Sequence, residues 1–81
     1  MKLTVYTLKN CPRCPAAKEL CSKIAKERNL NYEEIDIQDN IIEAFSRQIV
    51  SAPSIEINED VVFRGQLPTK EELLNEIGKR Q

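Results

Sequence analysis

The pattern of apolar and polar residues near the N-terminus predicts a strand followed by a helix. Residues 2–8, KLTVYTL, are rich in β-branched and aromatic side chains and end at a Lys-Asn-Cys-Pro break, which indicates a strand buried on both faces. Charged and apolar residues then alternate at helical spacing, and we predict an amphipathic helix over residues 12–28. Its apolar stripe is Ala17, Leu20, Cys21, Ile24 and Ala25.

The next two elements are shorter. In YEEIDI at residues 32–37, Ile35 and Ile37 alternate with acidic residues, which predicts a second strand. A helical crossover of this length joins parallel strands and is right-handed in nearly every known case. Asn40 and Glu43 have the spacing of a capping box, so we predict a helix over residues 41–48. Its first turns contain the apolar residues Ile41, Ile42, Ala44 and Phe45.

The C-terminal half predicts a hairpin and a last helix. Two β-type runs, SIEI at 54–57 and VVF at 61–63, are separated by Asn-Glu-Asp, as in a β-hairpin. Thr69 and Glu72 form a second capping-box pattern before an apolar helix face, and Gly78 stands where a helix usually ends. The order β-α-β-α-β-β-α predicts an α/β fold, with a four-stranded mixed sheet in a three-layer sandwich.

Length and composition restrict the function. A chain of 81 residues supports one domain, residues 1–81. Twelve basic and thirteen acidic residues give a net charge of −1 without a basic cluster, so we expect no nucleic-acid partner. The run LTVYTL is too short for a signal peptide or a membrane span, and we expect a cytoplasmic protein without a membrane partner.

The cysteines carry the candidate chemistry. Three cysteines cannot form a fully paired framework, and the absence of histidine excludes Cys-His hydrolases and mixed Cys/His zinc sites. In NCPRCP, Cys11 and Cys14 are three residues apart at the N-terminus of the predicted helix. The free N–H groups and the positive dipole end there stabilise a thiolate. We expect Lys9 and Arg13 to lower the thiol pKa further.

Two prolines bear on the start of this helix. Pro12 suits the first helical position, where its missing N–H would have no partner, and it therefore belongs to the set of residues expected to tune the thiols. Pro15 falls where an intrahelical hydrogen bond is expected, which predicts an irregular first turn.

The two thiols are not equivalent on the predicted helix. At 100° per residue, Cys14 lies about 50° from the middle of the apolar stripe and Cys11 about 110°. Cys14 should therefore face the core and Cys11 the solvent. We assign Cys11 as the nucleophile and Cys14 as the resolving thiol.

Other interpretations of the cysteines are two buried apolar residues or half of a metal site. One C-x-x-C supplies two thiolates, and Cys21 lies about 10 Å farther along the helix, so a complete metal site needs a second chain. We expect no resident metal. Cys21 falls inside the apolar stripe and is expected to be a core residue, with regulatory oxidation as the alternative.

YTLKNCPRC at 6–14, VSAPSIEI at 50–57 and VVFRG at 61–65 together resemble the thioredoxin and glutaredoxin superfamily, over nearly the whole chain. The resemblance implies a thioredoxin-like fold. Pro53 matches the family's cis proline, which faces the thiols, so we expect a cis Ala52–Pro53 bond. It further implies that the backbone of Ala52 pairs with an extended substrate, and that Gly65 lies near the thiols and allows close approach of the substrate backbone.

The resemblance implies a small dithiol-disulfide oxidoreductase, an electron carrier that reduces disulfides in protein partners. We expect a monomer without a bound cofactor, recharged by a reductase or a low-molecular-weight thiol. Arg13 stands where glutathione-using glutaredoxins usually have an aromatic residue, and RGQLP lacks their glycine pair. A glutathione-dependent glutaredoxin is the first alternative. A module whose thiolates hold zinc or an iron-sulfur cluster between two chains is the second.

Overall fold

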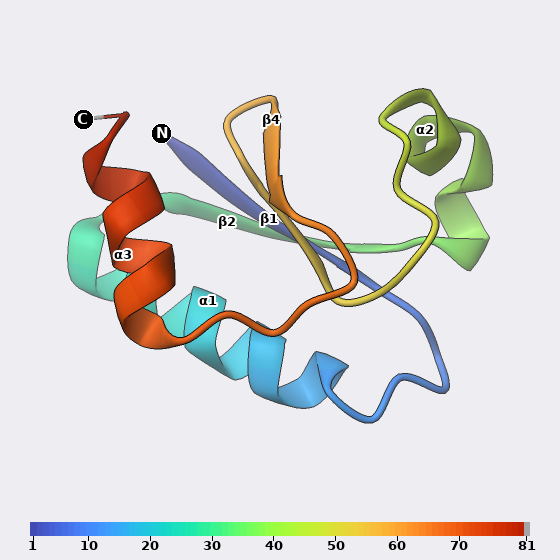
Figure 1. The fold of residues 1–81 in the computed structure, drawn as a ribbon, viewed down its shortest axis with the longest axis horizontal. Coiled ribbons are helices and arrows are strands. Elements are labelled where there is room, and N and C mark those ends of the chain that lie inside the picture. Colours follow the sequence, from blue (N-terminus) through green and yellow to red (C-terminus); the bar gives the residue numbers. More distant parts are fainter. Residues whose placement is uncertain (81) are drawn as a thin grey trace.

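The computed structural model describes residues 1–80 and has an α/β architecture (Figure 1). The predicted order β-α-β-α-β-β-α is confirmed, with a short 3₁₀ turn, Gln38–Asn40, added before the second helix. The elements are β1 (Lys2–Thr7), α1 (Cys14–Arg28), β2 (Asn31–Asp36), α2 (Ile41–Ser46), β3 (Ser54–Ile57), β4 (Asp60–Phe63) and α3 (Lys70–Gly78).

The strands form a mixed four-stranded sheet in the order β2-β1-β3-β4 within residues 1–80. β1 pairs with β2 in parallel, as the helical crossover predicts, and with β3 antiparallel. β3 and β4 form the antiparallel hairpin. β1 is therefore an inner strand, and its residues from Leu3 to Thr7 are all buried, which confirms a strand covered on both faces.

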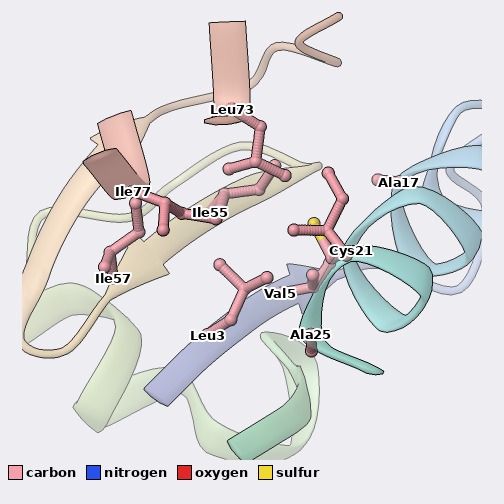
Figure 2. Close-up of a cluster of buried hydrophobic side chains, with 10 residues drawn as sticks. Leu3, Val5, Ala17, Cys21, Ala25, Ile55, Ile57, Leu73 and Ile77 are labelled. Atoms are coloured by element: carbon pink, nitrogen blue, oxygen red, sulfur yellow. The ribbon is translucent and has the colours of Figure 1, made fainter. Parts of the chain in front are cut away.

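Two apolar clusters lie on opposite faces of the sheet, so the three-layer sandwich is confirmed. One face packs against α1 and α3, and Figure 2 shows Leu73 and Ile77 of α3 above the sheet residues Ile55 and Ile57. The other face carries a smaller cluster beneath α2, which consists of Tyr6, Ile37, Ala44 and Ile49. Figure 1 shows α2 apart from the α1 and α3 pair.

Helix α1 begins two residues later than predicted. Its first residue is Cys14 and its N-cap is Arg13, so the assignment of Pro12 to the first helical position was wrong. Residues 12–13 form a turn instead. Pro15 consequently lies in the first turn of α1, where a missing N–H breaks no intrahelical bond, and the expected irregular first turn is not required.

Helix α2 differs most from its prediction, because it ends at Ser46 rather than at residue 48 and lacks the capping box. The Asn40 amide donates to the Asp36 carbonyl oxygen at 3.1 Å, while the Glu43 carboxylate accepts from Arg47 at 3.1 Å. The cause is the preceding 3₁₀ turn, which leaves Asn40 away from the extended conformation of a capping residue. Only Ala44 of α2 is buried.

Smaller differences concern the strands. β2 covers residues 31–36 rather than 32–37, and Ile37 is buried just beyond it. β4 begins at Asp60, one residue earlier than predicted. The hairpin turn is therefore the dipeptide Asn58-Glu59, and Asn58 has the positive φ of 58° that two-residue turns favour.

The predicted capping box of α3 is confirmed. Glu72 N–H donates to Thr69 Oγ1 at 3.1 Å, and Thr69 N–H donates to the Glu72 carboxylate at 2.9 Å. The end of this helix differs from expectation, because Gly78 is its last residue and the right-handed Lys79 follows as the C-cap. A glycine is therefore not required here for a left-handed backbone.

A buried polar network joins α2 to the sheet. The Tyr6 hydroxyl of β1 donates to the buried carboxylate of Glu56 on β3 at 2.9 Å. Arg47, which follows α2, forms an ion pair with the same carboxylate oxygen at 3.1 Å. Burial and the hydrogen bond to Glu56 raise the pKa of Tyr6. The hydrogen bond from Tyr6 and the ion pair with Arg47 offset the free-energy cost of removing the Glu56 carboxylate from water.

We expect Tyr6→Phe to lower the free energy of unfolding by about 1.5 to 3 kcal/mol, because it removes a buried hydrogen bond to a charged group. Tyr32→Phe is the control, since the Tyr32 hydroxyl donates mainly to the exposed Glu34 at 2.9 Å, with the Lys18 carbonyl oxygen farther away at 3.3 Å, and it should cost about 1 kcal/mol or less. Urea unfolding monitored by circular dichroism measures both. Equal losses in the two variants would contradict the role assigned to the network.

Candidate active site

Cys11 and Cys14 lie side by side where β1 leads into α1. The two are joined by a disulfide, with their Cα atoms 5.4 Å apart. Cys14 is the first residue of α1 and only 3% exposed, while Cys11 lies in the preceding turn and is partly exposed. The predicted orientation, with Cys14 toward the core and Cys11 toward solvent, is confirmed.

The start of α1 is electrostatically positive. Within residues 1–80, no side chain caps this helix end, and its first turn contains no acidic residue. The dipole of α1 is therefore not neutralised where the two sulfurs lie. Lys9 and Arg13, both exposed, line the same cavity as Cys11. This environment favours a negative charge on sulfur.

A cavity of about 430 Å³ lies beside Cys11. It brings the turn that carries Cys11 together with the segment that precedes β3, which includes Ala52. The Ala52–Pro53 bond is cis, as expected, and Pro53 is buried and does not itself line the cavity. The lining residues are Leu8, Lys9, Asn10, Cys11, Pro12, Arg13, Gln38, Val50, Ser51 and Ala52.

Gly65 lies behind this segment and is not among the lining residues. It has a φ of 68°, and a Cβ added there would collide with the Ser51 side chain. Its N–H donates to Ser54 Oγ at 3.2 Å. Ser54 Oγ in turn donates to the Ser51 carbonyl oxygen at 2.7 Å. The structure thus requires a glycine here for close packing against the segment that contains Pro53.

Sequence reasoning missed several residues of the cavity. Leu8, Asn10, Val50 and Ser51 lie inside the two motifs at 6–14 and 50–57 but were not singled out as site residues, although their position beside Cys11 and Pro53 was a signal that could have found them. Gln38 follows β2, on the opposite side of the central strand from β3, and no sequence signal connects it with the cysteines. Only the fold brings Gln38 to the cavity.

The thioredoxin domain family model matches residues 1–78 of the chain. The chain belongs to the thioredoxin family. It is 39% identical to a thioredoxin of Methanocaldococcus jannaschii, over 99% of this chain and 95% of that protein. It is also 35% identical to a probable thioredoxin of Methanothermobacter marburgensis, over 95% of this chain and 92% of that protein.

The fold agrees with this membership. The structure of thioredoxin 1 from Thermosipho africanus superposes with a TM-score of 0.82 at 23% identity, and the match covers 99% of this chain and 93% of that one. Members of the thioredoxin family are thiol-disulfide oxidoreductases. Cys11 and Cys14, in C-x-x-C spacing and at disulfide distance, are the dithiol couple of this member.

Among residues 1–80, no three or more cysteine, aspartate or glutamate side chains are grouped as metal ligands. A metal held by Cys11 and Cys14 would therefore need ligands from a second chain. None of the helices in this part of the chain is long and apolar enough to cross a bilayer.

Cys21 is a core residue, as expected. It is fully buried, and Figure 2 shows it on α1, turned toward the sheet beside Val5. Burial raises the pKa of its thiol from 9.0 to about 12. The thiol therefore stays protonated and shielded from reagents in the folded protein.

We expect the oxidised protein to react with iodoacetamide at no thiol in the folded state below pH 9.0, and at Cys21 alone in concentrated guanidinium. Mass spectrometry counts the adducts, and Cys21→Ala, which should show none in either condition, is the control. The unfolded thiol ionises before the folded one, so stability should also fall as the pH rises from 9.0 toward about 12. Rapid labelling of Cys21 in the folded protein would contradict its burial.

Proposed function

We propose that this thioredoxin-family protein transfers two electrons from Cys11 and Cys14 to disulfides of protein partners in the cytoplasm, where thiols are kept reduced. The observation that supports it most directly is the unequal burial of the two joined cysteines. A partner can reach Cys11 but not Cys14. The attacking and resolving roles follow from that difference.

The exchange is balanced in two steps. The Cys11 thiolate attacks one sulfur of the partner's disulfide, forms a mixed disulfide and releases the other partner sulfur as a thiolate. The Cys14 thiol then loses its proton and attacks Cys11 Sγ, which restores the Cys11–Cys14 bond. The partner leaves as a dithiol after taking up two protons. Two electrons have passed to the partner, and the protein is left with the Cys11–Cys14 disulfide.

Lys9, Pro12 and Arg13 tune the reactivity of Cys11. Lys9 and Arg13 place two positive charges on the cavity beside Cys11 and so lower the pKa of its thiol. Pro12 restricts the turn between the two cysteines, because its ring fixes φ. The role of Pro12 is therefore to hold the turn, since the helix starts only at Cys14.

The segment that contains Ala52 and Pro53 binds the substrate, and Gly65 packs behind it. The backbone of Ala52 lies on the cavity that contains Cys11 and is available to pair with an extended stretch of the partner. Pro53 and Gly65 act through the packing of this segment, since Gln66 N–H donates to the Pro53 carbonyl oxygen at 3.0 Å. Backbone pairing is tolerant of sequence, which suits several protein partners.

The oxidised protein is recharged by a protein reductase, and the protein acts as a monomer without a bound cofactor. The cavity is lined by Arg13 where glutathione-using glutaredoxins usually place an aromatic ring. Glutathione with glutathione reductase is the rival donor. If glutathione supports turnover at the rate seen with dithiothreitol, then glutathione and not a protein reductase is the electron donor.

We expect the reduced protein to accelerate insulin reduction by dithiothreitol, and Cys11→Ser to return the rate to the uncatalysed level, because the serine hydroxyl cannot attack a disulfide. When prereduced Cys14→Ser is mixed with insulin after dithiothreitol has been removed, the mixed disulfide with the substrate should accumulate and be visible by mass spectrometry. Cys21→Ala is the control that removes a thiol outside the site and retains activity. Full activity of Cys11→Ser would refute the mechanism.

A second prediction concerns the charges. We expect Lys9→Gln and Arg13→Gln each to slow alkylation of Cys11 below its pKa by about twofold to threefold, because an exposed charge contributes about 0.2 to 1 kcal/mol. Lys23→Gln is the control, since Lys23 lies about 14 Å along α1 from Cys14, beyond the range of strong interaction in salt. Identical rates in all three variants would remove Lys9 and Arg13 from the site.

A further inference from the structure

Several large apolar side chains on and just after α2 are exposed to solvent. Among residues 1–80, five large apolar side chains are exposed to solvent. Four of them lie within residues 41–50. They are Ile41 at 50%, Ile42 at 85%, Phe45 at 59% and Val50 at 72%. We call Ile41, Ile42, Phe45 and Val50 the α2 face. Three of them come from a helix of only six residues.

These side chains are not loosely attached core residues. Ala44 anchors α2 to the cluster beneath it, and Arg47 holds its C-terminal end through ion pairs with Glu43 and the buried Glu56. The inner side of α2 is therefore already occupied. Ile42 and Phe45 are directed outward by a helix whose orientation is set by other contacts.

The α2 face is continuous with the surface that a disulfide partner must cover. Val50 lines the cavity beside Cys11, and so does Gln38. Gln38 also lines the adjoining hollow over α2, together with Ile41 and Ile42. A path of neighbouring residues thus leads from Cys11 through Gln38 to the apolar side chains of α2.

The area that a redox partner buries can be compared with the surface of this molecule. Transient electron-transfer complexes bury less than about 1,200 Å² in total, or about 600 Å² on each partner. That is roughly one eighth of the 4949 Å² surface of this molecule. An interface of that size can extend beyond the cavity, and Gln38 connects the cavity to the hollow lined by Ile41 and Ile42.

We propose that the α2 face is a docking surface for the protein whose disulfide Cys11 attacks, and that this partner presents apolar side chains beside its reactive disulfide. This inference rests on the proposed function and deepens it. The cavity beside Cys11 binds the segment that contains the disulfide, and the α2 face selects among partners by burying apolar surface.

Synthetic peptides test this without knowledge of the natural partner. Each peptide is a Gly/Ser chain with one cysteine, blocked as a mixed disulfide with thionitrobenzoate, and a Leu-Phe-Leu tract about 4, 8 or 12 residues away. At about 3.3 Å per residue these spacings reach roughly 13 to 40 Å, which spans the 29 Å longest dimension of the molecule. A twin with Ser-Asn-Ser in place of the tract accompanies each peptide.

We expect the prereduced protein, mixed with each peptide for a single turnover without added reductant, to release thionitrobenzoate from at least one apolar peptide with a second-order rate constant about tenfold higher than from its polar twin, a gain of about 1.4 kcal/mol. The double variant Ile42→Ser, Phe45→Ser should lose this preference and still reduce the polar twins at the wild-type rate. Equal rates for apolar and polar peptides with the wild-type protein, or a preference that survives in the double variant, would overturn the proposal.

The polar twins separate this inference from the proposed function. If Cys11 is not the nucleophile, neither member of a pair is reduced; if only the docking surface is wrong, both are reduced equally. Sedimentation equilibrium tests the other possible occupant of the α2 face, which is a second copy of this chain. A wild-type dimer that becomes monomeric in the double variant would assign the α2 face to self-association and overturn the proposal.

Discussion

The packing of α1 against the central strands is the interaction on which the rest of the structure depends. Ala17, Cys21 and Ile24 fill the space between this helix and the sheet, and that contact fixes the rotation of α1 about its axis. Because Cys14 is the first residue of the same helix, its sulfur is turned inward, and the preceding turn leaves Cys11 toward solvent. The chemical difference between two identical side chains is thus a consequence of core packing.

The second apolar layer positions the rest of the site. Tyr6, Glu56 and Arg47 connect β1, β3 and the end of α2, so the segment between α2 and β3 is held at both ends. This segment brings Val50 and Ala52 to the cavity beside Cys11. Burial of a carboxylate is costly, and here Glu56 accepts a hydrogen bond from Tyr6 on β1 and forms an ion pair with Arg47 after α2. The same contacts direct the apolar side chains of α2 outward.

Local signals accounted for most of the fold. The run of β-branched and aromatic residues in β1 and the apolar stripe of α1 were sufficient for these elements, and the capping box of α3 was recognised from two residues, Thr69 and Glu72. The prediction failed where neighbouring residues offer other partners to the same side chains. Asn40 and Glu43 have capping-box spacing, yet the chain enters α2 through a 3₁₀ turn and both side chains bond elsewhere. The spacing of Asn40 and Glu43 alone does not show that other hydrogen-bond partners compete for these side chains.

The sequence by itself determined the C-x-x-C couple, the strand-helix-strand order that places it at a helix start, and, through resemblance, the proline that precedes β3. These are properties of residue type and spacing along one segment of chain. Only the tertiary structure decided that Gln38 and Val50 border Cys11, that Gly65 packs against Ser51, and that α2 turns Ile42 and Phe45 to solvent. Each of these depends on which distant elements meet, and that is settled by the free energy of packing the whole core rather than by any local periodicity.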